Sequence, residues 1–135
     1  MNRRVLLDAS VWIALRDARE PWHSRARELV RGLLGERARL AFTSLILGET
    51  LAYFSRSPRL RGQIMDDALR NPALDWEPVS HADELAALDL LRQQTDKSYS
   101  FCDAVSFVVM RRLGISRAAS FDIHFRQAGG FEVVG

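Results

Sequence analysis

The sequence is poor in the residues that mark several classes of protein. It has one cysteine, Cys102, so no intrachain disulfide can form and a reducing compartment is expected. No apolar run approaches the length of a membrane-spanning helix, and the first residues lack the charged-then-apolar pattern of a signal peptide. Lys97 is the only lysine, so almost all positive charge is arginine. These features exclude a disulfide scaffold and predict a cytoplasmic protein without a membrane anchor.

What the sequence contains is the composition of an ordinary globular protein. Its 135 residues are 47% hydrophobic and 27% charged, and we expect one domain over residues 1–135. The net charge is +2, but residues 1–70 carry 13 basic and 8 acidic groups, against 6 and 9 in the remainder. Arginine suits phosphate recognition, so RNA is a candidate partner, with Arg16, Arg19, Arg25 and Arg27 the group to test. Arginine in place of lysine can also reflect genome composition, and the charge pattern alone leaves both interpretations open.

Apolar segments of strand length alternate with segments of helical periodicity along the chain. The expected strands cover residues 5–7, 40–43, 74–79, 118–121 and 131–134. The expected helices cover residues 11–15, 22–34, 45–54, 60–69, 81–94 and 100–113. Ser10 and Ser44 are the expected caps of the first and third helices, and residues 127–130 read as a turn. This alternation predicts an α/β fold of three layers, with a central, mostly parallel sheet flanked by helices.

Four carboxylates stand alone in apolar segments. Asp8 and Asp122 are the only charged residues of their segments, and each follows an expected strand. Glu49 and Asp103 are isolated in the same way inside two expected helices. An ionised carboxylate among apolar groups is unfavourable unless something compensates it. Because the carboxyl ends of parallel strands meet at one edge of a sheet, we expect the four acids to converge there.

Crowded carboxylates repel one another, and a divalent cation would relieve that repulsion. Oxygen ligands alone suit Mg²⁺ or Mn²⁺ better than zinc. Structural alternatives exist for each acid, and Asp103 in particular forms the pattern of a capping box with Ser100. The coincidence of four isolated acids nevertheless favours a functional site. By contrast, Asp83 follows Ser80 in a similar box within a polar segment, and we interpret it as a cap only.

Four short blocks of the sequence resemble the signature motifs of PIN-domain ribonucleases. They are Asp8-Ala9-Ser10, Thr43-Ser44 followed by Glu49, Ser100-Phe101-Cys102-Asp103-Ala104 and Phe121-Asp122-Ile123-His124-Phe125. They occur in the family's order across nearly the whole chain. The sequence most resembles the small VapC-type toxins of bacterial VapBC toxin–antitoxin pairs.

The resemblance implies a PIN-like fold and an acidic catalytic site that binds the metal, formed by Asp8, Glu49, Asp103 and Asp122. Ser10 and Ser44 would supply hydroxyl groups close to that site, and Asp96 would lie at its rim. His124 is interpreted as a residue that supports the ligands or packs beside them, rather than as a proton shuttle. The resemblance also implies a metal-dependent endoribonuclease that leaves 5′-phosphate and 3′-hydroxyl ends, a small cognate antitoxin and a homodimer.

Two further features bear on function. The helix expected at residues 45–54 is apolar nearly all round apart from Glu49, so part of it could face a second copy or an inhibitory partner. The alternative is a central core helix. Cys102 has no histidine in its segment to activate it, which argues against a thiol nucleophile. The competing interpretation is a non-catalytic PIN-fold module that binds nucleic acid or protein, and the four intact acids favour the enzyme.

Overall fold

A computed structural model describes residues 3–135 of the chain. This range contains five strands: β1 (Arg4–Leu7), β2 (Arg39–Phe42), β3 (Leu74–Trp76), β4 (Arg117–Ala119) and β5 (Glu132–Val134). It also contains seven helices: α1 (Ala9–Arg16), α2 (His23–Gly35), α3 (Ser44–Tyr53), α4 (Pro58–Arg70), α5 (His81–Gln93), α6 (Phe101–Leu113) and α7 (Ile123–Ala128).

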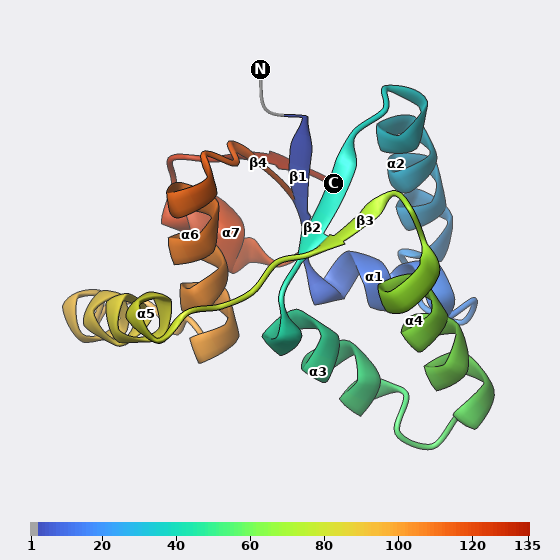
Figure 1. The fold of residues 1–135 in the computed structure, drawn as a ribbon, viewed down its shortest axis with the longest axis horizontal. Coiled ribbons are helices and arrows are strands. Elements are labelled where there is room, and N and C mark those ends of the chain that lie inside the picture. The colour runs from blue at the N-terminus through green and yellow to red at the C-terminus, as the bar shows by residue number, and fades with distance from the viewer. Residues whose placement is uncertain (1–2) are drawn as a thin grey trace.

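The strands form one parallel sheet in the order β3-β2-β1-β4-β5. The central strand is β1, where Leu6 is in register with Ala41 of β2 and Ala118 of β4. In Figure 1, β1 and β2 run downward, so their carboxyl ends lie at the lower edge, where α1, α3 and α6 begin. That edge is where an open parallel sheet gathers ligands.

Helices cover both faces of the sheet, which confirms the predicted three-layer α/β arrangement. Figure 1 shows α2 and α4 on one side and α5, α6 and α7 on the other. The core contains all three apolar residues of β1 together with Trp12 of α1 and Phe107 of α6, each fully buried or nearly so. Because central parallel strands are covered on both faces, they read as continuous apolar runs rather than as an alternating pattern.

Two expected helix caps are wrong by one or two residues. The first helix begins at Ala9 and is capped by Asp8, whose carboxylate accepts from the Ser10 amide. The third helix begins at Ser44 and is capped by Thr43, whose Oγ1 accepts from the backbone of Ile46 at 3.3 Å. In both cases the residue one or two positions earlier already has extended backbone and a side-chain acceptor, so the helix starts sooner. The Ser10 hydroxyl is thereby left for contacts outside the helix.

Other boundaries also differ from expectation. Helix α4 begins at Pro58 rather than residue 60, because Ser57 caps it and proline is favoured in the first turn of a helix. Strand β3 ends at Trp76, before Pro78, which cannot donate to a ladder. Helix α7 was not expected, and it occupies part of the predicted turn at residues 127–130. With six residues it is too short to show helical periodicity in the sequence.

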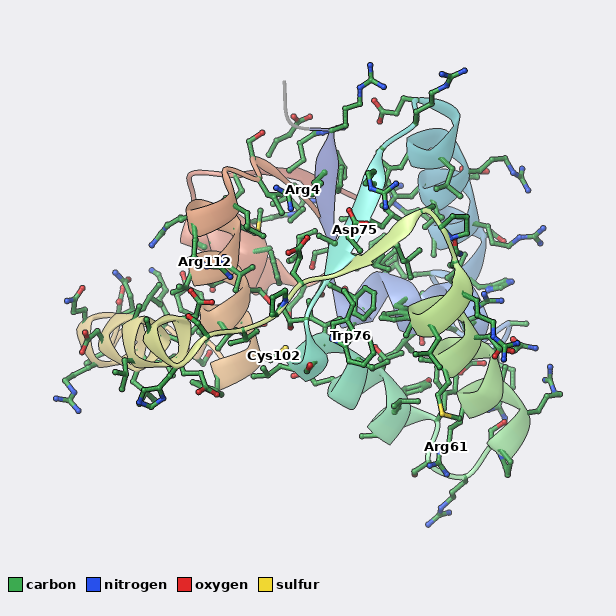
Figure 2. All side chains as sticks on the ribbon, in the orientation of Figure 1. Arg4, Arg61, Asp75, Trp76, Cys102 and Arg112 are labelled. Carbon is green, nitrogen blue, oxygen red and sulfur yellow. The ribbon has the colours of Figure 1, made fainter. Side chains whose placement is uncertain are left out.

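Helices α5 and α6 pack against each other and are joined by an ion pair. Arg112 Nε and Nη2 donate to the two carboxylate oxygens of Asp83, each at 2.9 Å. Asp83 also forms the predicted capping box with Ser80. The interpretation of Asp83 as a cap only is therefore incomplete, because this buried acid also connects two helices (Figure 2 labels Arg112).

Helix α3 is only partly covered by the rest of the chain. Ile46 and Thr50 are buried, while Leu47 and Leu51 are half-buried and Tyr53 is 51% exposed. The alternative of a central core helix is therefore wrong for this element. None of the helices between residues 3 and 135 combines the length and apolar character needed to cross a bilayer.

Candidate active site

Asp8 stands at the carboxyl end of the central strand and is buried. Its Oδ2 accepts hydrogen bonds from the hydroxyls of Ser10 at 2.6 Å and Ser120 at 2.9 Å. Its backbone N–H donates to the Ala119 carbonyl at 3.0 Å, which ties the end of β1 to β4. One carboxylate oxygen is thus held by two hydroxyl groups from separate segments, and the side chain is fixed in orientation.

Asp122 reaches the same edge from the end of β4. Its carboxylate accepts from the backbone N–H of His124 at 2.9 Å and caps α7. Its own N–H donates to Ser120 Oγ at 2.9 Å. Because the same Ser120 hydroxyl donates to Asp8, this serine links the two acids through one side chain.

Asp103 enters from the first turn of α6. It forms a reciprocal capping box with Ser100, with both hydrogen bonds at 3.0 Å. The structural alternative weighed for Asp103 is therefore real, but it does not exclude a further role. Asp103 also lines the pocket described below, so one carboxylate caps the helix and faces the other acids.

Glu49 comes from α3, and its carboxyl group interacts with the neighbouring Cys102 thiol. Figure 2 places Cys102 at the lower end of the sheet, near the first turns of α3 and α6. Burial and the neighbouring carboxylates raise the pKa of the Cys102 thiol far above its ordinary value. A thiolate nucleophile is therefore disfavoured, as the sequence indicates.

The four acids line one pocket of about 350 Å³. Among the described residues, its lining contains no lysine or arginine; the other contributors are Ala9, Ser10, Ile13, Ser98, Ser100 and His124. The carboxylates come from four separate elements that meet at the carboxyl edge of the sheet. The structure thus brings together Asp8, Glu49, Asp103 and Asp122, as their isolation in the sequence predicts.

The electrostatics of the pocket reflect burial and like charge. Burial raises the pKa of Asp8 above its usual range, against the hydrogen bonds from its two serine partners, and the charge of Asp103 raises it further. Partial desolvation raises the pKa of Glu49, and the charges of Asp8 and Asp103 add to it. Burial is also the main cause that raises the pKa of Asp103, with Asp122 contributing. A bound cation would reverse these shifts.

His124 lies between two of the acids. Its Nδ1 is 3.2 Å from both Asp103 Oδ2 and Asp122 Oδ1, and the three groups could share one metal ion. That buried nitrogen has no well-oriented hydrogen bond within residues 3–135. Ser98 Oγ lies 3.5 Å from Nε2 on the other side of the ring. His124 therefore lies within contact distance of two acids, and its role as a residue that supports the ligands stays a prediction.

Two residues expected near the site lie outside the pocket. Asp96 is exposed and pairs with Lys97 at 3.0 Å, so it does not join the cluster. Ser44 is exposed, and its hydroxyl accepts from the Trp76 indole at 3.1 Å rather than from a site residue. Ser10, in contrast, contacts Asp8 directly.

Sequence reasoning missed Ser120 and Ser98. Ser120 is fully buried and bonds both Asp8 and the backbone of Asp122. A hydroxyl residue placed directly after an apolar strand, two positions before an isolated acid, is the signal that could have identified it. Nothing in the loop sequence around Ser98 distinguishes it, because its place beside His124 depends on packing between segments far apart in the chain.

Comparison with known proteins agrees with this geometry. The PIN domain family matches residues 5–130. The chain is similar to the 23S rRNA-specific endonuclease VapC20 of Mycobacterium tuberculosis, with 34% identity over 131 residues, 96% of this chain and 97% of the relative. The crystal structure of M. tuberculosis VapC20, described as a sarcin–ricin loop cleaving toxin, has a TM-score of 0.83 and 30% identity over 93% of this chain and 95% of that one. VapBC2 from Rickettsia felis, crystallised with promoter DNA, has a TM-score of 0.66 over 97% of each chain, and its 13% identity shows a likeness of fold alone.

The chain belongs to the PIN-domain family. It is a VapC-type endoribonuclease toxin of a toxin–antitoxin system. The predicted family, fold and function as an endoribonuclease toxin are thus confirmed.

Proposed function

We propose that this VapC-type endoribonuclease hydrolyses RNA phosphodiester bonds with the help of Mg²⁺ or Mn²⁺, bound by Asp8, Glu49, Asp103 and Asp122. The observation that carries the proposal is that four carboxylates from four elements line one pocket without a lysine or arginine among its described residues. The hydrogen bonds to these carboxylates come from neutral hydroxyl and backbone N–H groups, so no lysine or arginine of the described lining neutralises the charge. Oxygen ligands of this kind suit hard divalent cations.

The residues present fit such an ion. Burial and mutual repulsion raise the pKa of Asp8, Glu49 and Asp103, which is the condition that a cation relieves. The orphaned Nδ1 of His124 between two carboxylates offers a further ligand atom. When bound, an ion of this class neutralises charge on the scissile phosphate and favours deprotonation of an attacking water.

The chain's own residues prepare the site by orienting the acids. Ser10 and Ser120 hold one oxygen of Asp8, and the Ser100 box and the α7 cap hold Asp103 and Asp122. Hydrogen bonds of this kind to ligating carboxylates fix their direction and are costly to lose. His124 then acts beside the acids, either as a ligand or as a group that holds the Asp103 and Asp122 carboxylates in place.

The RNA substrate proposed is a structured ribosomal RNA segment. The similar toxin from M. tuberculosis is named as a 23S rRNA-specific endonuclease that cleaves the sarcin–ricin loop. Exposed Arg19 and Arg56 line a hollow with Tyr53 of α3, the helix that supplies Glu49, and would contact the backbone of such an RNA.

The proposed partners are a cognate antitoxin and a second copy of the chain. The Rickettsia structure is a VapBC2 assembly, which supports a small antitoxin for this toxin. An arginine of the antitoxin that reached the acidic pocket would replace the charge of the metal and so inhibit the enzyme. The partly exposed α3, with Met65 and Leu69 exposed on neighbouring α4, provides apolar surface for a homodimer.

The test is cleavage mapping on purified protein. A hairpin RNA with the sarcin–ricin loop sequence is incubated with Mg²⁺, with Mn²⁺ or with EDTA, and the products are sequenced and tested for terminal phosphate. We expect cleavage at one position, only with metal, with 5′-phosphate and 3′-hydroxyl ends. RNA binding without metal-dependent cleavage, together with no metal binding by calorimetry, would favour the non-catalytic module instead.

A further inference from the structure

A second pocket, of about 360 Å³, adjoins the acidic one. The two share Ser10, Ile13 and Asp122 in their linings. The second pocket is completed by Glu20 and by three aromatic rings, those of Trp22, Tyr53 and Phe121. Among the described residues it has no lysine or arginine in its lining, so it combines an apolar aromatic surface with negative charge.

Neither helix capping nor burial explains the position of Trp22. It occupies the N-cap of α2, a position that favours short polar side chains, and makes no side-chain capping bond. Its indole is 48% exposed, so burial does not explain it either. Instead it stacks on Phe121, with ring centroids 5.0 Å apart and planes inclined by 21°. The contact with Phe121 orients the indole while much of it stays open to solvent.

The aromatic pair is connected rigidly to the acids. The Phe121 N–H donates to Ser10 Oγ at 3.0 Å, and that same hydroxyl donates to Asp8 at 2.6 Å. Phe121 is also the residue between Ser120 and Asp122, which both belong to the acidic site. The third ring of the lining is that of Tyr53, whose hydroxyl donates to buried Asp17 at 2.9 Å, which orients the ring. The position of the rings relative to the acids is therefore set by the backbone and a few short hydrogen bonds.

We propose that this second pocket, here called the base pocket, binds the nucleobase next to the scissile phosphate by stacking it on Trp22. This inference rests on the proposed RNA hydrolysis at the acidic site. The carboxylates of Glu20 and Asp122 disfavour a phosphate in the base pocket, whereas an aromatic wall accepts the π-face of any base. Because the two pockets share three residues, an RNA strand whose phosphate lies at the acids places a neighbouring base at Trp22.

The first test measures binding to the hairpin RNA with the sarcin–ricin loop sequence, in Ca²⁺ to slow cleavage. In a Trp76→Phe protein the remaining indoles are exposed Trp22 and fully buried Trp12, so quenching by RNA reports on Trp22. In the wild-type background, we expect Trp22→Leu to raise the dissociation constant roughly five- to 150-fold, the range for loss of one base–aromatic stack. The dependence of log affinity on log salt should keep its slope, because no phosphate contact is lost.

The second test asks whether the binding free energy lost in Trp22→Leu comes from contact with one base. Abasic residues are introduced one at a time along the hairpin, and each RNA is bound to wild type and to Trp22→Leu. At one position we expect base removal to weaken wild-type binding but to leave the affinity of Trp22→Leu unchanged, since the stack is already absent. Leu88→Ala, which truncates a similarly exposed apolar residue on α5, serves as control and should bind every RNA as wild type does.

Three outcomes would overturn the base pocket. Wild-type affinity in Trp22→Leu, additive effects at every abasic position, or a loss of affinity that follows a changed molar mass in light scattering would each assign Trp22 another role. Failure of the proposed function looks different. In that case no metal-dependent cleavage of the RNA is seen, while quenching of Trp22 and the non-additive abasic position are retained.

Discussion

The carboxylate of Asp8 has three roles. It caps α1, it accepts hydrogen bonds from two serine hydroxyls, and it lines one pocket with three other acids. These roles compete energetically. The hydrogen bonds favour the charged form, while burial and neighbouring charge disfavour it, and burial has the largest effect on its pKa. Holding Asp8 in this position lowers the stability of the metal-free fold, and such a cost is typical of a functional site.

Replacing Asp8 by Asn keeps the shape and an acceptor oxygen but removes the charge. We expect RNA cleavage to fall by at least about 10²-fold, since several kcal/mol of stabilisation depends on the metal ligands. Metal affinity by calorimetry should fall with it, and the metal-free protein should gain up to about 1 kcal/mol in unfolding free energy. Asp96→Asn is the matched control, because Asp96 pairs with Lys97 outside the pocket. Wild-type cleavage by Asp8→Asn would refute the assignment.

The stability of the metal-free protein should depend on pH through the same acids. An acid whose folded pKa is raised contributes stability that is complete below its unfolded pKa and is lost as pH rises through the folded value. For Asp8, Glu49 and Asp103 the loss therefore begins above about pH 4, the ordinary carboxyl range. Chemical unfolding in EDTA across pH 4 to 8 measures it. The gain from Asp8→Asn should grow as pH rises, and a gain independent of pH would contradict this account.

Among the elements, α5 and α6 share an apolar cluster and are also joined by the ion pair of Asp83 and Arg112. Asp83 is buried, and the Arg112 guanidinium is the main cause that holds its pKa below the usual range, with Ser80 assisting. Figure 1 shows α5 projecting at the margin of the molecule beside α6. The orientation of α6 matters to the site, because its first turn supplies Asp103.

Arg112→Ala leaves Asp83 without its cation, and we expect a loss of about 1–2 kcal/mol in unfolding free energy, reduced by the partial exposure of Arg112. A depressed acid pKa contributes stability that is present above the unfolded pKa and lost as pH falls through the folded one. The difference between wild type and Arg112→Ala should therefore shrink below about pH 4. Denaturant unfolding at pH 7 and pH 3 measures it, with Arg92→Ala on exposed α5 sequence as control.

For the molecule as a whole, the basic half of the chain is not one uniform RNA-binding surface. Arg16 forms an ion pair and hydrogen bonds with Asp67. Asp67 also accepts a hydrogen bond from the buried Trp12 indole at 3.1 Å, so Arg16 has a structural role. Arg25 donates to the Gly135 carbonyl at 2.8 Å. Of the four arginines grouped from sequence, Arg19 lines a hollow beside Tyr53 of α3, and Arg56 lines it too.

Replacing Arg19 and Arg56 together by Gln should weaken RNA binding and reduce the salt slope by about 1.4, if each contacts one phosphate of a single strand. Fluorescence anisotropy between 50 and 200 mM salt, roughly the range where such effects are large, measures the slope. The matched control is Arg31 with Arg92, both exposed and outside that hollow. An unchanged slope in the Arg19 and Arg56 variant would leave these residues as ordinary solvated surface.

The proposed homodimer is tested by light scattering at micromolar concentration. We expect a dimer for the wild type and a shift toward monomer for Leu69→Glu, which places charge on the exposed apolar surface of α4. Leu88→Glu places the same charge at an exposed leucine of a separate helix, α5, and should leave the mass unchanged. A wild-type monomer would remove self-association from the proposal.

The sequence by itself determined the order of the five strands and of helices α1 to α6, the parallel sheet and the identity of the four pocket acids. It could do so because these features depend on local rules: buried parallel strands read as apolar runs, and an isolated acid in such a run needs compensation. The errors at Ser10, Ser44 and α7 are failures of the same local rules, where two residues competed for a cap or a helix was too short to show a period.

Only the tertiary structure decided which distant groups meet. Ser120 joins Asp8 across 112 residues, and Arg16 finds Asp67 across 51, while Asp96 stays outside although it lies close to Asp103 in sequence. Trp22 and Phe121 become a stack beside the acids in the same way. Such contacts arise from how helices pack onto the two faces of the sheet, and a long-range pair leaves no periodic or capping signal in either segment.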